Sequence, residues 1–168
     1  FTKIRLEIKE EKIQEVNIAD IASVAIATIQ PFSIQMDVSI VLEVRSEAII
    51  MADPGDIEIV FNNLISNAVK YNKIGGKAEV IIDSTETEVI LVFSDTGIGI
   101  NEGDKENLFT EFVRIKNEKT RNISGSGLGL SIVKKVIELY HGTIKVDSKP
   151  DVGTVFTVRL PKKQITLT

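Results

Sequence analysis

The chain has 168 residues, 43% of them hydrophobic and 26% charged, which is the composition of one globular domain with a sizeable core. This balance excludes a disordered chain, and the net charge of −4 argues against nucleic acid as a partner. Cysteine is absent, which excludes disulfides, and no uninterrupted apolar run reaches the ~18 residues that span a bilayer. Because the chain begins at Phe1, we expect a cytoplasmic fragment of a longer protein.

Hydrophobic periodicity predicts helices and strands that do not alternate as βαβ repeats. Residues 1–16 are charged and weakly alternating, as in a lead-in segment or an edge strand. Helices are expected at 18–30, 55–72 and 128–140, with a short helical patch at 104–110. Strands are expected at 38–44, 48–51, 77–83, 87–94, 143–148 and 154–160. Few long helices and strands that form hairpins favour an α+β fold, with helices on one face of a mixed sheet.

Four residues near helix ends carry specific predictions. Asn17 is placed to cap the first helix, and Pro31 should interrupt or kink it, because proline lacks the N–H that a helix interior needs. The only histidine, His141, is expected to be structural at the end of the helix at 128–140, where a cation suits the carbonyl end. Gly142 should supply the left-handed residue that ends this helix.

The helix at 55–72 is the strongest prediction, because an apolar stripe runs along it from Ile57 to Ala68. At 100° per residue, Asn63, Asn67 and Lys70 fall within about 60° of one another at the border of that stripe. Two carboxamides and an ammonium at the edge of a core suit Mg²⁺ and phosphate oxygens. The alternative is an ordinary solvated polar face.

A first glycine motif, SDTGIGI at 94–100, ends the strand at 87–94. Glycines at 97 and 99 let the backbone turn sharply and let a flat ligand approach, while Asp95 can accept a hydrogen bond from an amino group. The same letters are also a good turn. By itself this motif therefore leaves ligand binding and a plain turn both open.

A second glycine motif, GSGLGL at 125–130, precedes the helix at 128–140 and offers free N–H groups at its positive end, which is an anion site. It is neither a Walker loop nor the dinucleotide fingerprint, and a flexible hinge is the alternative. Upstream, Phe109 and Phe112 would anchor a lid against the core. Arg114, beside them, could reach a terminal phosphate, although cations in such segments are usually only solvated.

In this order, the motifs resemble those of the catalytic, ATP-binding domain of histidine kinases, in the gyrase, chaperone, kinase and MutL superfamily. Asn63 to Tyr71 resembles the N box, Asp95 to Gly99 the first glycine box and Phe109 to Phe112 the F box. Gly125 to Leu130 resembles the second glycine box, and Gly153-Thr154 the last and shortest one. The resemblance covers about residues 18–161, and five matches in sequence make accident improbable.

The resemblance implies a Bergerat-type fold, a two-layer sandwich of a mostly antiparallel sheet and about three helices. Residues 1–17 would lead in from an upstream helical domain, 18–161 would form the catalytic domain, and 162–168 a tail. By the same resemblance, Asn67 with Asn63 would hold Mg²⁺ on ATP, Lys70 and Arg114 would contact phosphates, and Asp95 would accept from adenine. The remaining nucleotide-binding positions implied are Tyr71, Gly97, Gly99, Ile100, Gly125, Ser126, Gly127, Leu128, Gly129 and Leu130.

The resemblance also implies partners, and it leaves other functions as alternatives. The phosphate acceptor would be a histidine on a separate helical dimerisation domain, and a response regulator receiver domain would follow. We expect this domain by itself to be monomeric, without nucleic-acid or membrane contacts, although its parent protein can be membrane-anchored. One rival is an ATP hydrolase of the gyrase or MutL kind, although Asn63 stands where a catalytic glutamate would be expected. The others are a pseudo-enzyme that only binds and an anti-sigma-type serine kinase.

Overall fold

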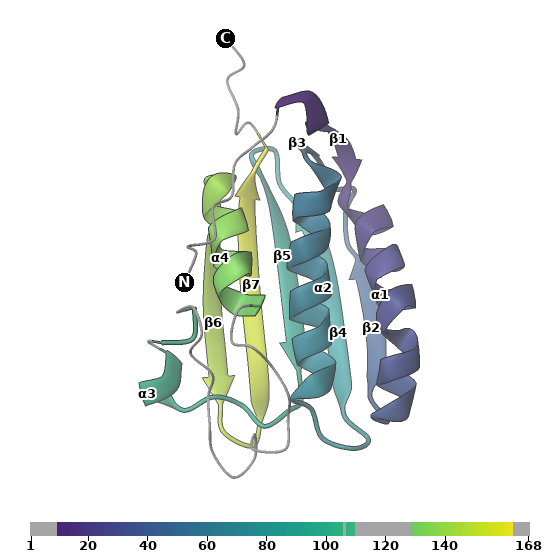
Figure 1. Cartoon of the computed structure of the whole chain (residues 1–168), viewed down its shortest axis with the longest axis vertical. Helices are drawn as coiled ribbons and strands as arrows, with labels where there is room; N and C mark the ends of the chain where they lie inside the picture. Colours follow the sequence, from purple (N-terminus) through teal and green to yellow (C-terminus); the bar gives the residue numbers. More distant parts are fainter. Residues whose placement is uncertain (1–9, 106, 110–128, 163–168) are drawn as a thin grey trace, which may run out of the picture.

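The computed structural model describes residues 10–105, 107–109 and 129–162. Helices cover one face of a sheet, so the domain has two layers (Figure 1). The helical elements are η1 (Glu10–Lys12), α1 (Ile18–Gln35), α2 (Pro54–Lys70), α3 (Glu102–Lys105) and α4 (Gly129–Leu139). The strands are β1 (Gln14–Asn17), β2 (Ser39–Val44), β3 (Ile49–Ala52), β4 (Lys77–Ser84), β5 (Glu88–Asp95), β6 (Thr143–Lys149) and β7 (Gly153–Pro161).

The main sheet has five strands in the order β2-β4-β5-β7-β6. Only β2 and β4 run parallel, because α2 lies between them in the sequence, whereas the other neighbours are antiparallel. The predicted α+β class, with a mixed and mostly antiparallel sheet on about three helices, is therefore confirmed. Strand β1, inside the segment expected to be a lead-in, pairs with β3 in a separate two-stranded sheet and buries Val16.

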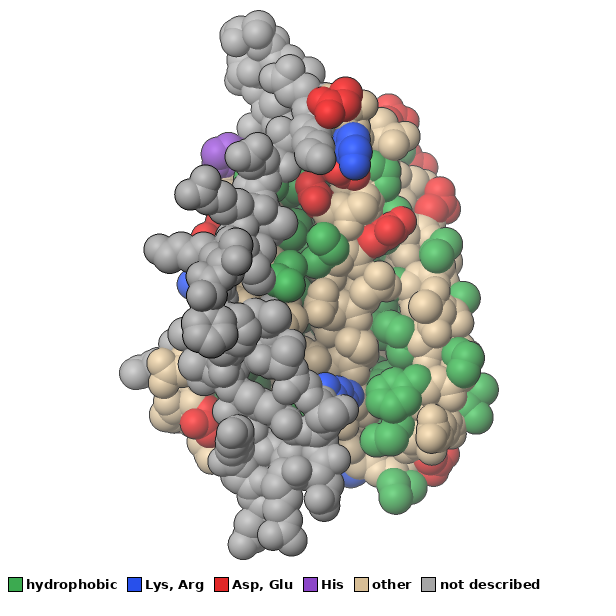
Figure 2. Space-filling model, in the orientation of Figure 1, with side chains coloured by type: hydrophobic (Ala, Val, Ile, Leu, Met, Phe, Trp, Pro, Cys, Tyr) green, Lys and Arg blue, Asp and Glu red, His purple; other side chains and the backbone are tan. Residues whose placement is uncertain are grey.

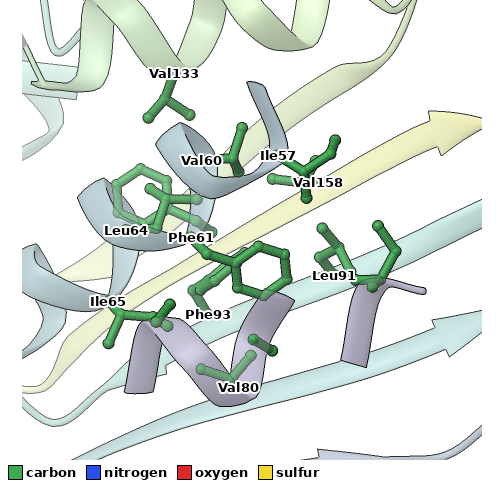
Figure 3. Packing of buried hydrophobic residues seen from close by; sticks show 14 of the residues in the cluster. Ile57, Val60, Phe61, Leu64, Ile65, Val80, Leu91, Phe93, Val133 and Val158 are labelled. Atoms are coloured by element: carbon green, nitrogen blue, oxygen red, sulfur yellow. The ribbon is translucent and has the colours of Figure 1, made fainter. Parts of the chain in front are cut away.

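The core lies between the helix layer and the sheet. Every residue of the predicted apolar stripe on α2 is buried, namely Ile57, Val60, Phe61, Leu64, Ile65 and Ala68. Phe61 packs edge-on against Phe93 of β5, with ring centroids 5.3 Å apart (Figure 3). Strands β4 and β5 bury alternate residues, as expected of strands with only one covered face. The direction of this alternation decides which strand-end residues face the helices.

The first helix is capped as predicted but is not interrupted. The Asn17 side chain accepts the N–H of Ala19 at 3.1 Å, while α1 continues through Pro31 to Gln35. Proline removes the hydrogen bond to the Ala27 carbonyl, but Ala27 is exposed, so water can replace the lost donor. The short helix α3 begins and ends earlier than the predicted patch at 104–110.

The end of α4 corrects the prediction for Gly142. The left-handed residue is His141, with φ 59°, and the N–H of Gly142 bonds the Ile137 carbonyl at 2.8 Å, which closes a Schellman motif. Gly142 is required for space instead, because a Cβ there would collide with the Arg159 carbonyl oxygen on β7. The glycine thus lets the end of α4 lie directly against the sheet.

Helix α1 has the length and apolar composition of a membrane-spanning helix, although polar residues interrupt its apolar ones. Asp20 is its only charged residue. One face belongs to the core, since Ile18, Ala22, Ala25 and Ile29 are buried. Its outer face exposes Val24, Phe32 and Ile34, and hydrophobic side chains lie along it in Figure 2. Because the inner face packs against α2 and β2, we treat α1 as a core helix of this domain.

A polar link fixes α4 along α2. The buried Tyr140 hydroxyl donates to the Asp56 carboxylate at 2.6 Å and accepts the backbone N–H of Asp53 at 3.0 Å. Burial raises the pKa of Asp56, although the bond from Tyr140 opposes this shift. Asp53 itself caps α2 by accepting the N–H of Gly55. These bonds hold the end of α4 at the start of α2. The beginning of α4 therefore lies farther along α2, beside Asn63.

Candidate functional site

Asp95 lies at the end of β5 on the face that the helices cover, because Val89, Leu91 and Phe93 alternate into the core before it. Its carboxylate accepts the N–H of Gly97 at 2.8 Å and the backbone N–H of Thr154. Burial nevertheless dominates and raises the pKa of Asp95 to about 6. The site therefore contains a half-buried acidic acceptor that is ionised at neutral pH.

The first glycine motif is packed between the end of α2 and the turn that joins β6 to β7. The Ile98 N–H donates to the Tyr71 carbonyl at 3.0 Å, and a Cβ on Gly97 would collide with that carbonyl. Gly99 has φ +72°, and a Cβ there would collide with the Lys149 carbonyl. Both glycines are therefore required by the backbone, and the motif lies beside the C-terminal end of α2.

The polar stripe on α2, formed by Asn63, Asn67 and Lys70, is half-buried, and the contacts of its side chains differ along the helix. The Asn63 amide donates to the Ile59 carbonyl at 2.7 Å, and its oxygen would lie 2.8 Å from a Cβ on Gly129, the first residue of α4. Among the residues that the structure describes, none forms a hydrogen bond with the Asn67 side chain. Lys70 lies over the Tyr71 ring, 5.4 Å from its centroid. The N box and the end of the second glycine box are thus in contact.

The described part of the chain contains no group of three or more His, Cys, Asp or Glu side chains that could hold a metal ion. A cation at the Asn67 carboxamide would therefore need most of its ligands from a bound phosphate chain and water. Mg²⁺ is commonly held in this way, because it keeps several waters and shares its remaining positions with substrate phosphates. The Asn67 carboxamide, which is half-buried and has no hydrogen bond to another described residue, fits such a group.

Part of the expected lid falls outside the described residues, namely Phe112, Arg114, Gly125, Ser126, Gly127 and Leu128. The described members lie next to the core. The Phe109 ring packs edge-on against Phe156 of β7, with centroids 6.4 Å apart, and Lys134 of α4 lies 5.5 Å from its centroid. Gly129 and Leu130 form the start of α4, and both are half-buried.

Two hydroxyls, one opposite Asp95 on β7 and one on the next strand, β6, were not among the predicted site residues. Thr154 is buried and lies opposite Asp95 in the pairing of β5 with β7. Ser148 of β6 accepts the Ile100 N–H at 2.7 Å and lies 2.8 Å from the Thr154 hydroxyl. The Gly153-Thr154 motif could have pointed to Thr154. Nothing local in the sequence marks Ser148, because its partner Ile100 lies 48 positions away.

Comparison with known proteins agrees with this geometry. The family described as "Histidine kinase-, DNA gyrase B-, and HSP90-like ATPase" matches residues 52–164. Sensor histidine kinase WalK of Bacillus subtilis is 41% identical over 114 residues, which are 67% of this chain and 19% of WalK. The catalytic domain of histidine kinase ThkA is similar with a TM-score of 0.78 at 27% identity, over 89% of this chain and 95% of that domain. ThkA in complex with the response regulator protein TrrA gives a TM-score of 0.74 at 27% identity, over 90% of this chain and 42% of ThkA.

The chain belongs to the family of histidine kinase-, DNA gyrase B- and HSP90-like ATPases. Within that family it is an ATP-binding catalytic domain of the histidine kinase type, which confirms the resemblance seen in the sequence. The chain spans about a fifth to a quarter of the length of the curated relatives that it matches.

Proposed function

We propose that this chain is the catalytic part of a two-component sensor histidine kinase, which presents the γ-phosphate of Mg-ATP to a histidine on a separate helical domain. One observation carries the proposal. Three parts of the site are in contact with one another. Gly97 bonds Asp95 and lies against Tyr71 at the end of α2, and Gly129 at the beginning of α4 lies against Asn63. Phosphoryl transfer needs positioning and charge neutralisation more than covalent help, and such an arrangement supplies both.

The adenine would bind at Asp95. An ionised carboxylate accepts hydrogen bonds and donates none, so it suits the 6-amino group of the base. Tyr71, at the end of α2, would lie along the nucleotide, and Gly97, Gly99 and Ile100 would line the base pocket. The two glycines support this assignment indirectly, because their missing side chains let the glycine motif pack against the Tyr71 and Lys149 carbonyls beside Asp95.

The phosphates would lie along α2 towards the start of α4. Asn67, together with the Asn63 oxygen, would hold Mg²⁺, which when bound neutralises phosphate charge and orients the terminal phosphate. Lys70 would contact the phosphates, and the amides of residues 125–130 would receive them at the positive end of α4. Arg114 would reach the γ-phosphate. The metal assignment is supported by the Asn67 carboxamide, which forms no hydrogen bond within the described part of the chain.

Transfer is favoured over hydrolysis because the described stripe of α2 presents asparagine rather than glutamate. Asn63 is a poor base, and its amide is already bonded to the Ile59 carbonyl. The parent protein would act in the cytoplasm on a response regulator, by analogy with ThkA, which is known in complex with one. We retain residues 18–161 as the catalytic unit, to which β1 adds residues 14–17 through its pairing with β3.

The decisive experiment supplies this chain with labelled ATP, alone and together with the acceptor domain of its own full-length protein. We expect tight ATP binding, slow hydrolysis by the chain alone, and label on a histidine of the added domain as acid-labile phosphohistidine. Brisk steady-state hydrolysis by the isolated chain would favour the gyrase or MutL kind of activity. Bound ATP with no label on any acceptor would indicate a pseudo-enzyme, and label on serine would indicate the serine kinase.

The Asn67→Ala variant tests the metal assignment. We expect ATP affinity in the presence of Mg²⁺ to fall roughly tenfold or more, to the value measured without the metal, because one direct ligand is lost. Calorimetric titrations with and without Mg²⁺ measure this difference, and Asn62→Ala, an exposed asparagine of the same helix, is the matched control. An Asn67→Ala variant that keeps the full Mg²⁺ dependence would remove Asn67 from the metal site.

A further inference from the structure

The hydroxyl of Ser148 joins three segments that are distant in the sequence. It accepts the Ile100 N–H at the end of the first glycine motif, at 2.7 Å. It also bonds the Gly153 carbonyl oxygen at 2.9 Å and the Thr154 hydroxyl at 2.8 Å. One half-buried side chain on β6 therefore ties the glycine motif to the beginning of β7.

The directions of these bonds follow from counting protons. A serine hydroxyl has one proton to donate and two lone pairs that accept. The Gly153 carbonyl can only accept, so Ser148 must donate its proton there. The Thr154 hydroxyl must then donate its own proton to Ser148, since no proton is left for the opposite direction. Ser148 is thereby saturated, and the Thr154 oxygen keeps only acceptor capacity.

Thr154 and Asp95 are neighbours on the same face of the sheet. They lie opposite each other in the pairing of β5 with β7, and the preceding pair on that face, Phe93 and Phe156, is buried. Residues directly opposite in an antiparallel pair have Cβ atoms within about 5 Å. The Thr154 N–H also donates to the Asp95 carboxylate. The Thr154 oxygen and the ionised carboxylate therefore form a pair of acceptors at one corner of the site, and neither group has a proton left to donate.

We propose that Ser148 is a positioning residue for base selection. By accepting the hydrogen bond of the Thr154 hydroxyl, Ser148 leaves this corner with acceptors alone, so that the corner admits a 6-amino purine and rejects a 6-oxo purine. The inference rests on the proposed function, because it requires the base to bind at Asp95. The amino group of adenine offers two N–H donors, directly or through one water. The 6-oxygen of guanine would face these acceptors with no proton between them. The resulting repulsion between oxygen atoms would disfavour guanine.

The test compares ATP with GTP at pH 8, where Asp95 is ionised because its pKa lies at about 6. In Ser148→Ala, the Thr154 proton loses its partner and can turn towards the base. We expect ATP binding to weaken about fivefold and the preference for ATP over GTP to fall at least about tenfold, measured by calorimetry. Ser148→Thr keeps the hydroxyl and should keep the preference. Thr154→Val should lose the preference as Ser148→Ala does, and the double variant should lose no more.

Ser46 provides the matched control at the opposite end of the sheet. Its hydroxyl also joins two segments, by donating to Asp83 at 2.7 Å and accepting the Ser84 N–H at 2.8 Å. Ser46→Ala should lose stability but keep the wild-type preference. A folded Ser148→Ala with the wild-type preference would overturn the inference and leave the proposed function standing. If Ser148→Ala does not fold, an unchanged preference in Thr154→Val overturns it equally. Wild-type chain that binds neither nucleotide would overturn both.

Discussion

Asp95→Asn is expected to lose ATP binding and to be more stable than the wild-type chain in the absence of ligand above pH 6. The carboxylate already accepts the N–H groups of Gly97 and Thr154. An asparagine would use its single oxygen for those donors and would turn its NH₂ group towards the amino group of adenine, donor against donor. We expect ATP to bind roughly a hundredfold more weakly, which corresponds to a lost charge-assisted bond and an unpaired donor.

The gain in stability follows from the direction of the pKa shift. The pKa of Asp95 rises from 3.8 to about 6 on folding, so the folded state holds the proton more tightly than the unfolded state. The stability of the wild-type chain should therefore fall as pH rises from about 4 to 6 and then level off. Asparagine does not titrate. The variant should thus gain roughly 2 kcal/mol relative to wild type above pH 6, and little near pH 4.

Urea unfolding of both proteins at pH 4, 5, 6 and 8 measures this difference, and calorimetry measures the loss of ATP. Asp83→Asn is the control of opposite sign. The Ser46 hydroxyl bond holds the pKa of Asp83 below its usual value, so that carboxylate contributes stability above its pKa and loses it in acid. Asp83→Asn should therefore be less stable than wild type at neutral pH. An Asp95→Asn variant with no pH-dependent gain would contradict the burial of an ionised Asp95.

Gly99→Ala should destabilise the fold and the base pocket together. Two costs combine at this position. Its φ of +72° strains any residue with a Cβ, by about 1 kcal/mol, and that Cβ would collide with the Lys149 carbonyl. The turn between β6 and β7 must then move away, which strains the bond from the Asp151 N–H to the Ile98 carbonyl. We expect a total loss of about 3 kcal/mol in urea unfolding, and weaker ATP binding.

Two other glycines separate these costs. Gly75 has φ +78° with nothing within 4 Å of an added Cβ, so Gly75→Ala should lose only the ~1 kcal/mol of backbone strain. Gly103 lies in α3 with open space around it and no positive φ. Gly103→Ala should be neutral or gain up to about 1 kcal/mol from helix propensity. Equal losses in Gly99→Ala and Gly75→Ala would show that the collision with the Lys149 carbonyl is unimportant.

Much of the fold could be predicted from the sequence because its signals are local. The apolar stripe from Ile57 to Ala68 identified α2, and the alternation around residues 84–86 identified the hairpin of β4 and β5. The failures involve contacts made elsewhere in the chain. Pro31 does not end α1, since its missing bond lies on an exposed side, and Gly142 is needed for its closeness to Arg159 on β7. Neither reason can be read from the neighbouring residues.

For the site, the residue types and their order could be read from the sequence. The acidic strand end, the asparagine-bearing helix and the glycine motifs are recognisable because each has particular residues at fixed spacing. The hydrogen-bond partners of these groups depend on the folded chain. The structure showed that Asn63 is bonded to Ile59 whereas Asn67 is not bonded among the described residues. It also showed that Ser148 saturates its hydroxyl against Ile100, Gly153 and Thr154. Hydrogen-bond partners and burial depend on which strands and helices become neighbours, and that is settled only when the whole sheet and its helix layer have assembled.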